Sequence, residues 1–147
     1  MTRTRSSSIR LGVLALALVA LAPSCSAGHE PRHGTDLGVT LRDFHIGLGR
    51  ATVPSGPVTF DVHNVGPSTH EFLVVRTKLA AGRLPIGTDG LRVNEDSPLL
   101  HAVKEDSELD LGDAHQVSVH LPPGDYVLYC NLEGHYLGGM YASLTVR

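Results

Sequence analysis

Short segments in which apolar and polar residues alternate fill much of the chain after residue 37, and they constrain its fold more than any other feature. These segments are 37–46, 56–66, 115–130 and 141–146, and 71–76 is a compact apolar strand between them. Successive side chains of a β-strand point to opposite faces of a sheet, so this alternation is typical of half-buried strands. Glycine, proline and asparagine separate the segments, as they do in turns. The pattern predicts an all-β fold, a β-sandwich.

Residues 79–113 lack this alternation and contain several turn signals. We expect an irregular insert here, with short helical or strand pieces, because such a long connection is rarely structureless. The insert ends in an acidic run. This run is either a solvated edge of the domain or a docking patch for a cationic partner. Its members are Glu105, Asp106, Glu108, Asp110 and Asp113.

The first 25 residues have the composition of an export signal. Arg3, Arg5 and Arg10 precede an apolar run over 11–22, and small residues follow it. A membrane-spanning helix needs roughly 20 apolar residues, so this run is too short to span a bilayer. We therefore expect a signal peptide over 1–25, a polar tether over 26–36 and one folded domain over 37–147.

The signal ends in "LAPSC", which resembles the lipobox of bacterial lipoproteins. The resemblance implies that Cys25 becomes the lipidated first residue and anchors the protein to the outer face of the cytoplasmic membrane. Ordinary cleavage after Ser24 or Ala27 is the alternative. Removal of the signal leaves nine of the twelve basic residues and all fifteen acidic ones, a net charge of −6. This charge argues against a nucleic-acid partner.

If the protein is exported, Cys130 has no evident disulfide partner. The chain has only two cysteines. If Cys25 is lipidated, Cys130 is unpaired in an oxidising compartment, where a free thiol is a liability unless it is buried or bound to a metal. A disulfide between the two cysteines is the other possibility.

The motif "YCNLEGHYLGGMY" (129–141) places Cys130, His135 and Met140 at five-residue intervals. Thiolate and imidazole together suit zinc, copper or iron, and an added thioether favours copper. A fourth ligand must come from elsewhere, and His70 in "NVGPSTHEF" (64–72) is the best candidate. Two histidines, one cysteine and one methionine are the ligands of a blue-copper site. We expect Asn64 and Gly66 to form the turn that places His70.

The two motifs together resemble those of the cupredoxins, the plastocyanin- and azurin-like copper proteins. The spacing Cys-x4-His-x4-Met is similar to that of the longer-loop, rusticyanin- and sulfocyanin-like members. The resemblance covers 37–147 and implies a Greek-key β-sandwich. It implies that His70 and His135 bind one copper ion through imidazole, Cys130 through thiolate and Met140 as a long axial ligand.

The resemblance also points to residues around the metal: Asn64, Glu71 and Asn131. Family members often have Asn or Ser after the first histidine, and this chain has Glu71. Such a residue can hydrogen-bond the ligand loop. A carboxylate there adds negative charge, so we expect it to favour Cu(II) and lower the reduction potential.

The expected function is one-electron transfer between a donor and an acceptor protein, by a monomer. Leu132, Leu137 and Gly138–Gly139 would form a flat docking surface around His135. We do not expect an enzyme, because the chain has no His-x-His pair and room for only one domain.

A copper chaperone, buffer or sensor is the alternative function. Such proteins usually have open sites rich in Met or His, whereas Met140 and Met1 are the only methionines here. Five other histidines of the folded domain have no sulfur neighbour in sequence, and we expect solvated or hydrogen-bonded roles for them: His45, His63, His101, His115 and His120. In the tether, His29 and His33 could together form a weak metal-capture site, but we expect them to belong to a solvated linker.

Overall fold

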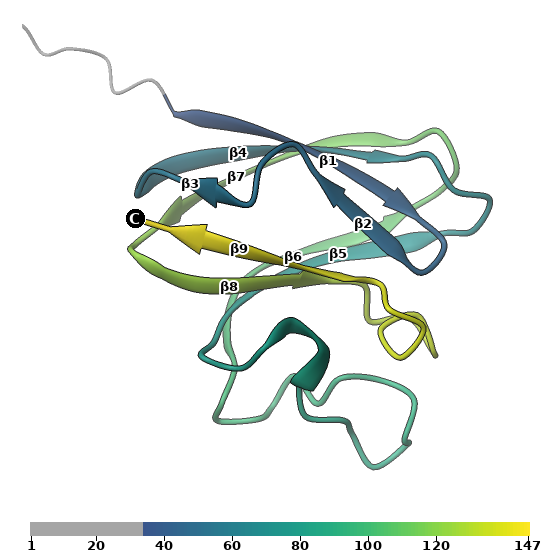
Figure 1. The fold of residues 1–147 in the computed structure, drawn as a ribbon. Coiled ribbons are helices and arrows are strands. Elements are labelled where there is room, and N and C mark those ends of the chain that lie inside the picture. Colours follow the sequence, from purple (N-terminus) through teal and green to yellow (C-terminus); the bar gives the residue numbers. More distant parts are fainter. Residues whose placement is uncertain (1–33) are drawn as a thin grey trace, which may run out of the picture. The chain divides into compact units, whose positions relative to one another are not determined.

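The computed structural model describes residues 34–147, which form two β-sheets packed face to face (Figure 1). The four-stranded sheet has the order β2-β1-β4-β7, and the five-stranded sheet has the order β3-β9-β8-β5-β6. The strands are β1 (Thr35–Arg42), β2 (His45–Leu48), β3 (Thr52–Val53), β4 (Gly56–Asn64), β5 (His70–Arg76), β6 (His101–Leu109), β7 (Ala114–Leu121), β8 (Gly124–Tyr129) and β9 (Tyr141–Val146). The predicted all-β sandwich is confirmed.

The alternation seen in the sequence builds the core between the sheets. In β1, Leu37, Val39 and Leu41 are buried while the residues between them are exposed. The rings of Phe60 and Phe72 meet edge to face across the core, with centroids 5.4 Å apart. Full burial of one such side chain contributes about 1.5–3 kcal/mol to the stability of the fold.

The first predicted strand is in fact a hairpin. Instead of one segment over 37–46, β1 ends at Arg42, a two-residue turn follows, and β2 begins at His45. Phe44 in the turn has φ of 59°. Two-residue hairpin turns require positive φ, which favours Gly or Asn, so a phenylalanine gave no signal of a turn. β1 also starts at Thr35, two residues before the expected start of the domain.

The irregular insert is shorter than expected, because 101–109 forms strand β6. β6 lies at the edge of the five-stranded sheet, and its pairing with β5 is interrupted by register shifts. Charged residues are common on edge strands, where they discourage pairing with another chain. Because β6 contains several of them, its sequence lacks the apolar alternation by which the other strands were predicted. A short 3-10 helix, η1 (Ala81–Arg83), lies in the remaining insert. No helix within 34–147 is long and apolar enough to cross a membrane.

The insert covers the outer face of the five-stranded sheet and forms a second, smaller hydrophobic cluster with it. The buried members are Leu73, Val75, Ala81, Leu84, Val93, Leu100, Val127, Tyr129 and Tyr136. Tyr136 comes from the loop that carries the predicted ligands Cys130, His135 and Met140. The insert therefore packs against the back of the predicted metal-binding loop.

Candidate metal centre

His70 is the first residue of β5 and is fully buried. The loop before it folds around the side chain of Asn64. The Nδ2 of Asn64 donates hydrogen bonds to the carbonyl oxygens of Ser68 and Leu109, both at 2.8 Å, and its Oδ1 accepts one from the N–H of Gly66 at 3.0 Å. The sequence-based role of Asn64 as a turn former is therefore visible in its hydrogen bonds.

Gly66 is required where this loop crosses the β1–β2 turn. A Cβ at Gly66 would lie 2.9 Å from the Cα of Arg42 and 3.1 Å from the Nε2 of His70. Real Cβ atoms essentially never come within 3.0 Å of another atom, so the main chain at Arg42 excludes a side chain here. The glycine thus lets the chain pass between the turn and the buried histidine.

Cys130 follows the last residue of β8 and is also fully buried. Its sulfur accepts a hydrogen bond from the N–H of Glu71 at 3.3 Å, which joins the two predicted ligand segments. Burial raises the pKa of the Cys130 thiol, so deprotonation is unfavourable without a nearby cation. The thiol is the one free cysteine within 34–147, and Cys25 lies outside these residues.

The loop from Cys130 to Met140 closes on itself through main-chain hydrogen bonds. The N–H of Met140 donates to the carbonyl of His135 at 3.0 Å, and the N–H of Cys130 donates to the carbonyl of Met140 at 3.2 Å. Gly134 and Gly139 have φ of 78° and 104°, in the left-handed region that favours glycine. Met140 is fully buried in the main core, beside Cys130 in the same cluster.

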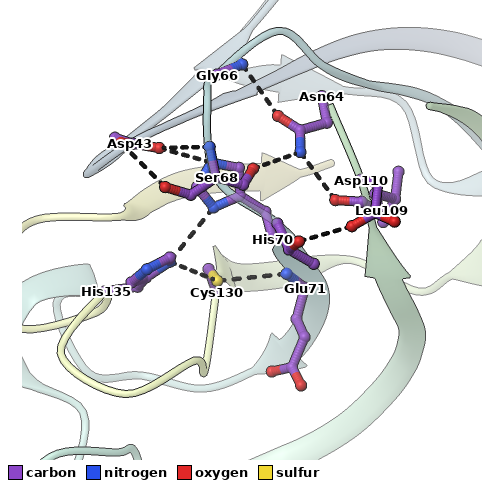
Figure 2. A network of polar contacts seen from close by, with 11 residues as sticks. Asp43, Asn64, Gly66, Ser68, His70, Glu71, Leu109, Asp110, Cys130 and His135 are labelled. Atoms are coloured by element: carbon purple, nitrogen blue, oxygen red, sulfur yellow. Dashed lines mark hydrogen bonds and ion pairs between the residues drawn. The ribbon is translucent and has the colours of Figure 1, made fainter. Parts of the chain in front are cut away.

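These segments bring His70, Cys130 and His135 together at one end of the sandwich (Figure 2). The Nδ1 atoms of the two histidines are 3.3 Å apart, and the Nδ1 of His135 is 3.4 Å from the sulfur of Cys130. One ligand atom from each of the three residues lies within 4.8 Å of the others. Of the four predicted ligands, His70, Cys130 and His135 therefore form this cluster, and Met140 is buried on the same loop as Cys130 and His135.

The surroundings favour a neutral His70. Burial lowers the pKa of His70, and the neighbouring His135 lowers it further, while Asp43 acts in the opposite direction. A neutral imidazole has a lone pair to offer to a metal, whereas a protonated one has none. The site is thus suited to receive a cation.

Asp43 in the β1–β2 turn is the residue that sequence reasoning missed. Its Oδ1 lies 3.3 Å from the Nε2 of His70. The same carboxylate accepts hydrogen bonds from the N–H of Ser68 at 3.3 Å and from the Oγ of Ser68 at 3.2 Å. Asp43 and His70 are far apart in sequence, and nothing in the pattern around Asp43 pointed to a metal site.

Glu71 and Asn131, both predicted to lie near the metal, direct their side chains away from the three ligand atoms. Figure 2 shows the carboxylate of Glu71 extending away from the cluster, with only its main-chain N–H on the sulfur. Burial raises the pKa of Glu71, as do Glu95 and other nearby carboxylates, while the N–H of Asn131 opposes the shift. The side chain of Asn131 binds the insert: its Oδ1 accepts from the N–H of Val93 at 2.7 Å.

Two further contacts hold the insert against the ligand loop. The hydroxyl of Tyr136 donates to the carbonyl of Ala81 at 2.7 Å and accepts from the N–H of Leu84 at 2.8 Å. The N–H of Gly134 donates to the carbonyl of Leu91 at 3.1 Å. The predicted irregular insert therefore braces the loop that carries His135.

The remaining described histidines do not form a second centre. Within 34–147, the group formed by His70, Cys130 and His135 is the only one whose atoms lie close enough together to hold a metal ion. His115 instead contacts the carboxylate of Asp106 at 2.9 Å. His29 and His33 lie outside the described residues.

The acidic run takes part in the turns at this end of the sandwich. Asp110 accepts a hydrogen bond from the hydroxyl of Thr69 at 2.6 Å, next to His70. The carboxylate of Asp113 accepts from the N–H of Asp110 at 2.8 Å and closes the turn between β6 and β7. Part of the run thus has a structural role, beyond either of the roles that the sequence suggested.

No protein-family model matches the sequence, and no protein of curated function matches it either. Solved structures do match. Auracyanin from Roseiflexus castenholzii is 22% identical over 78% of this chain and 98% of its own, with a TM-score of 0.56. Auracyanin B is 24% identical over 77% of this chain and 88% of its own, with a TM-score of 0.54.

Rusticyanin from Thiobacillus ferrooxidans is 16% identical over 78% of this chain and 79% of its own, with a TM-score of 0.54. At these identities the likeness concerns the fold. Residues 34–147 thus form a cupredoxin-like β-sandwich.

Proposed function

We propose that this protein binds one copper ion in a type 1 site and transfers single electrons between redox partner proteins. The observation that supports this most directly is the approach of two imidazole nitrogens and a buried thiol to within 4.8 Å of one another. Met140, buried on the same loop, would supply a thioether as a weak axial ligand. Bound copper would supply a one-electron couple between Cu(I) and Cu(II).

The donor set fits copper better than it fits other common metals. Calcium and magnesium prefer oxygen ligands, and no carboxylate belongs to the cluster of His70, Cys130 and His135. Zinc accepts thiolate and imidazole, but the thioether of Met140 adds softness that favours copper. The buried thiol of Cys130, whose pKa is raised, would be deprotonated when a cation binds beside it.

The frame around the ligands supports a carrier. Hydrogen bonds join Glu71 to Cys130 and close the ligand loop, so the donor atoms are held before any metal arrives. A site held in this way changes little between two oxidation states, and four protein donors leave no position for a substrate. We therefore propose an electron carrier in preference to an enzyme.

Four exposed apolar side chains at the metal end of the sandwich suit partner docking. They come from the loops that follow β1, β4, β6 and β8, and they are Phe44, Val65, Leu111 and Leu137. Of the surface expected from the sequence, Leu137 is exposed, but Leu132 is half-buried against the core and does not belong to this group. His135 is only half-buried, so its imidazole would be the route by which electrons pass to a partner.

The proposal includes an exported, monomeric protein, anchored through Cys25 at the outer face of the cytoplasmic membrane. This part rests on the sequence of residues 1–36, most of which lie outside the described residues. Detergent partitioning of the protein from its native cells, compared with a Cys25→Ser variant, tests the anchor. Loss of membrane association in the variant supports lipidation, and unchanged association contradicts it.

A copper chaperone, buffer or sensor is the alternative function. Release of copper to another protein is easier from an open site, whereas His70, Cys130 and Met140 are all fully buried. Their burial supports the carrier. Reversible one-electron reduction without loss of copper would separate the two functions.

The proposal is tested by optical and electron paramagnetic resonance spectra of the copper-loaded domain. An intense thiolate-to-Cu(II) band and a narrow copper hyperfine splitting are expected. Cys130→Ser should abolish the band, and His70→Ala should weaken copper binding. His115→Ala, which changes a histidine that contacts Asp106 and lies outside the cluster, is the matched control and should keep the spectrum. A wild-type protein without the band would refute a type 1 site.

A further inference from the structure

The second ring nitrogen of His70 needs an acceptor. Its Nδ1 faces His135, and its Nε2 points to the other side of the ring, where it is fully buried without a well-aligned hydrogen bond. If Nδ1 is to offer a lone pair to a metal, the proton of the neutral ring must sit on Nε2. A buried N–H without an acceptor is costly, so its surroundings decide which nitrogen carries the proton.

The carboxylate of Asp43 is the acceptor within reach. Its Oδ1 lies 3.3 Å from the Nε2 of His70, an ion-pair distance at which a small rotation would give a hydrogen bond. His70 is fully buried, while 32% of the Asp43 side chain is exposed. The charge of Asp43 is thus partly solvated and can face the ring without full desolvation.

Ser68 holds Asp43 in this place. Its N–H and its hydroxyl both donate to the Asp43 carboxylate, at 3.3 and 3.2 Å (Figure 2). Ser68 belongs to the same loop that delivers His70, two residues later. The position of the carboxylate relative to the ring is therefore fixed by one short segment.

Gly66 keeps the space between them free. A side chain there would meet the N–H of Asp43 at 3.0 Å and the Nε2 of His70 at 3.1 Å. Because Gly66 has no side chain, the carboxylate of Asp43 can lie directly against the imidazole of His70. Ser68, Gly66 and the β1–β2 turn thus all favour the contact between Asp43 and His70. Three independent features that support one contact indicate a functional role for it.

We propose that Asp43 is the positioning residue of the metal centre: it accepts the Nε2–H of His70 and so directs the Nδ1 lone pair toward Cys130. Outer hydrogen-bond partners of metal-binding histidines act in this way in general. Asp43 also places a negative charge on the far side of the ring, which favours Cu(II) over Cu(I). The copper readouts rest on the proposed function, but the proton position on His70 does not.

The test compares Asp43→Ala, which removes the acceptor, with Asp43→Asn, which keeps an acceptor oxygen but removes the charge. Asp125→Asn makes the same charge change at the start of β8, far from the site along the strand, and is the matched control. Two-bond proton–nitrogen correlation spectra of the metal-free proteins report which nitrogen of His70 carries the proton. Wild type, Asp43→Asn and Asp125→Asn should show the Nε2–H form, and Asp43→Ala should lose it.

Copper binding gives the second readout. Asp43→Ala should lower Cu(II) affinity by about 10–100-fold, the usual effect of losing such a partner. Asp43→Asn should bind Cu(I) relatively better than wild type does, which appears as a higher reduction potential. Asp125→Asn should leave the potential close to that of wild type. If Asp43→Ala does not fold, Ser68→Ala replaces it, because it removes a hydrogen bond that holds Asp43 in place. The proposal then requires that Ser68→Ala reduce the Nε2–H form of His70.

An unchanged Nε2–H form in Asp43→Ala would overturn the proposal, whatever metal the protein binds. Equal potentials in Asp43→Asn and wild type would overturn its electrostatic part. If wild type lacks a type 1 spectrum but the proton moves in Asp43→Ala, the proposed copper function fails and the positioning role of Asp43 stands.

Discussion

The ring of Phe44 meets the ring of His135 edge to face, with centroids 5.7 Å apart and an interplanar angle of 68°. Phe44 holds this position in a left-handed backbone conformation that bulky residues rarely adopt. Its neighbour in the same turn, Asp43, lies against His70. A single two-residue turn therefore touches both histidines of the candidate site.

The contact between Phe44 and the ligand loop can be measured by a double-mutant cycle. A Cβ at Gly138 would overlap the Phe44 ring, so Gly138→Ala should destabilise the metal-free protein by about 1–3 kcal/mol. In a Phe44→Ala background the overlap is gone and the cost should be smaller. Urea unfolding of the four proteins gives the coupling energy. Strict additivity would mean that the ring and Gly138 do not interact.

Met140→Leu tests the axial ligand. Met140 is fully buried in the main core, and a swap of similar volume usually costs less than about 1.5 kcal/mol, so the protein should fold. Copper should remain bound and the reduction potential should rise, because a weak donor to Cu(II) is lost. Voltammetry of the loaded protein measures the change. A potential equal to that of wild type would show that Met140 is not a ligand.

Glu71 should make the metal-free protein less stable as the pH rises. Burial raises the pKa of Glu71 in the folded state, so the folded protein binds this proton more tightly than the unfolded chain does. The corresponding stability is fully present below the unfolded-state pKa and is lost as the pH rises through the folded-state pKa. Urea unfolding of wild type and Glu71→Gln from about pH 4 upward, near the ordinary carboxyl pKa, measures the difference.

The Glu71→Gln variant should show a smaller loss of stability over this pH range than wild type. It should also raise the reduction potential of the copper-loaded protein, since a negative charge near the site is removed. Glu133→Gln, an exposed carboxylate on the ligand loop, is the comparison for the same change in net charge. Parallel pH curves for wild type and Glu71→Gln would contradict the prediction.

Tyr136→Phe tests whether the insert braces the ligand loop. The variant leaves the N–H of Leu84 without its buried acceptor, which should cost about 1–3 kcal/mol of stability. Amide hydrogen exchange should become faster in the insert, and Tyr141→Phe is a control because no hydrogen bond of its hydroxyl is seen within the described residues. Unchanged exchange at Leu84 would show that the Tyr136 hydroxyl does not hold the insert.

The predicted ligands could be identified from the sequence because they lie in two short segments. Cys130, His135 and Met140 share one loop, and His70 follows a recognisable turn. Strands such as β1 and β4 were visible because one face of each is buried, which forces alternation.

Asp43 and β6 were missed for a different reason. Asp43 reaches His70 only because β1 runs parallel to β4, with Leu41 opposite Asn64, and this pairing brings the turn beside the next loop. β6 is an edge strand whose pairing shifts register, so its pattern lacks regular alternation. Both features depend on which strands become neighbours, and that information is spread over the whole chain.

All four predicted ligands belong to β5 or to the loop between β8 and β9, within the five-stranded sheet, whereas Asp43 is carried by the four-stranded sheet. The two hydrogen bonds from Ser68 to Asp43 therefore connect the four-stranded sheet to the loop that carries His70. The absorption spectrum of a copper-loaded protein would depend mainly on the five-stranded sheet, whereas its reduction potential would also depend on how the two sheets are aligned with each other.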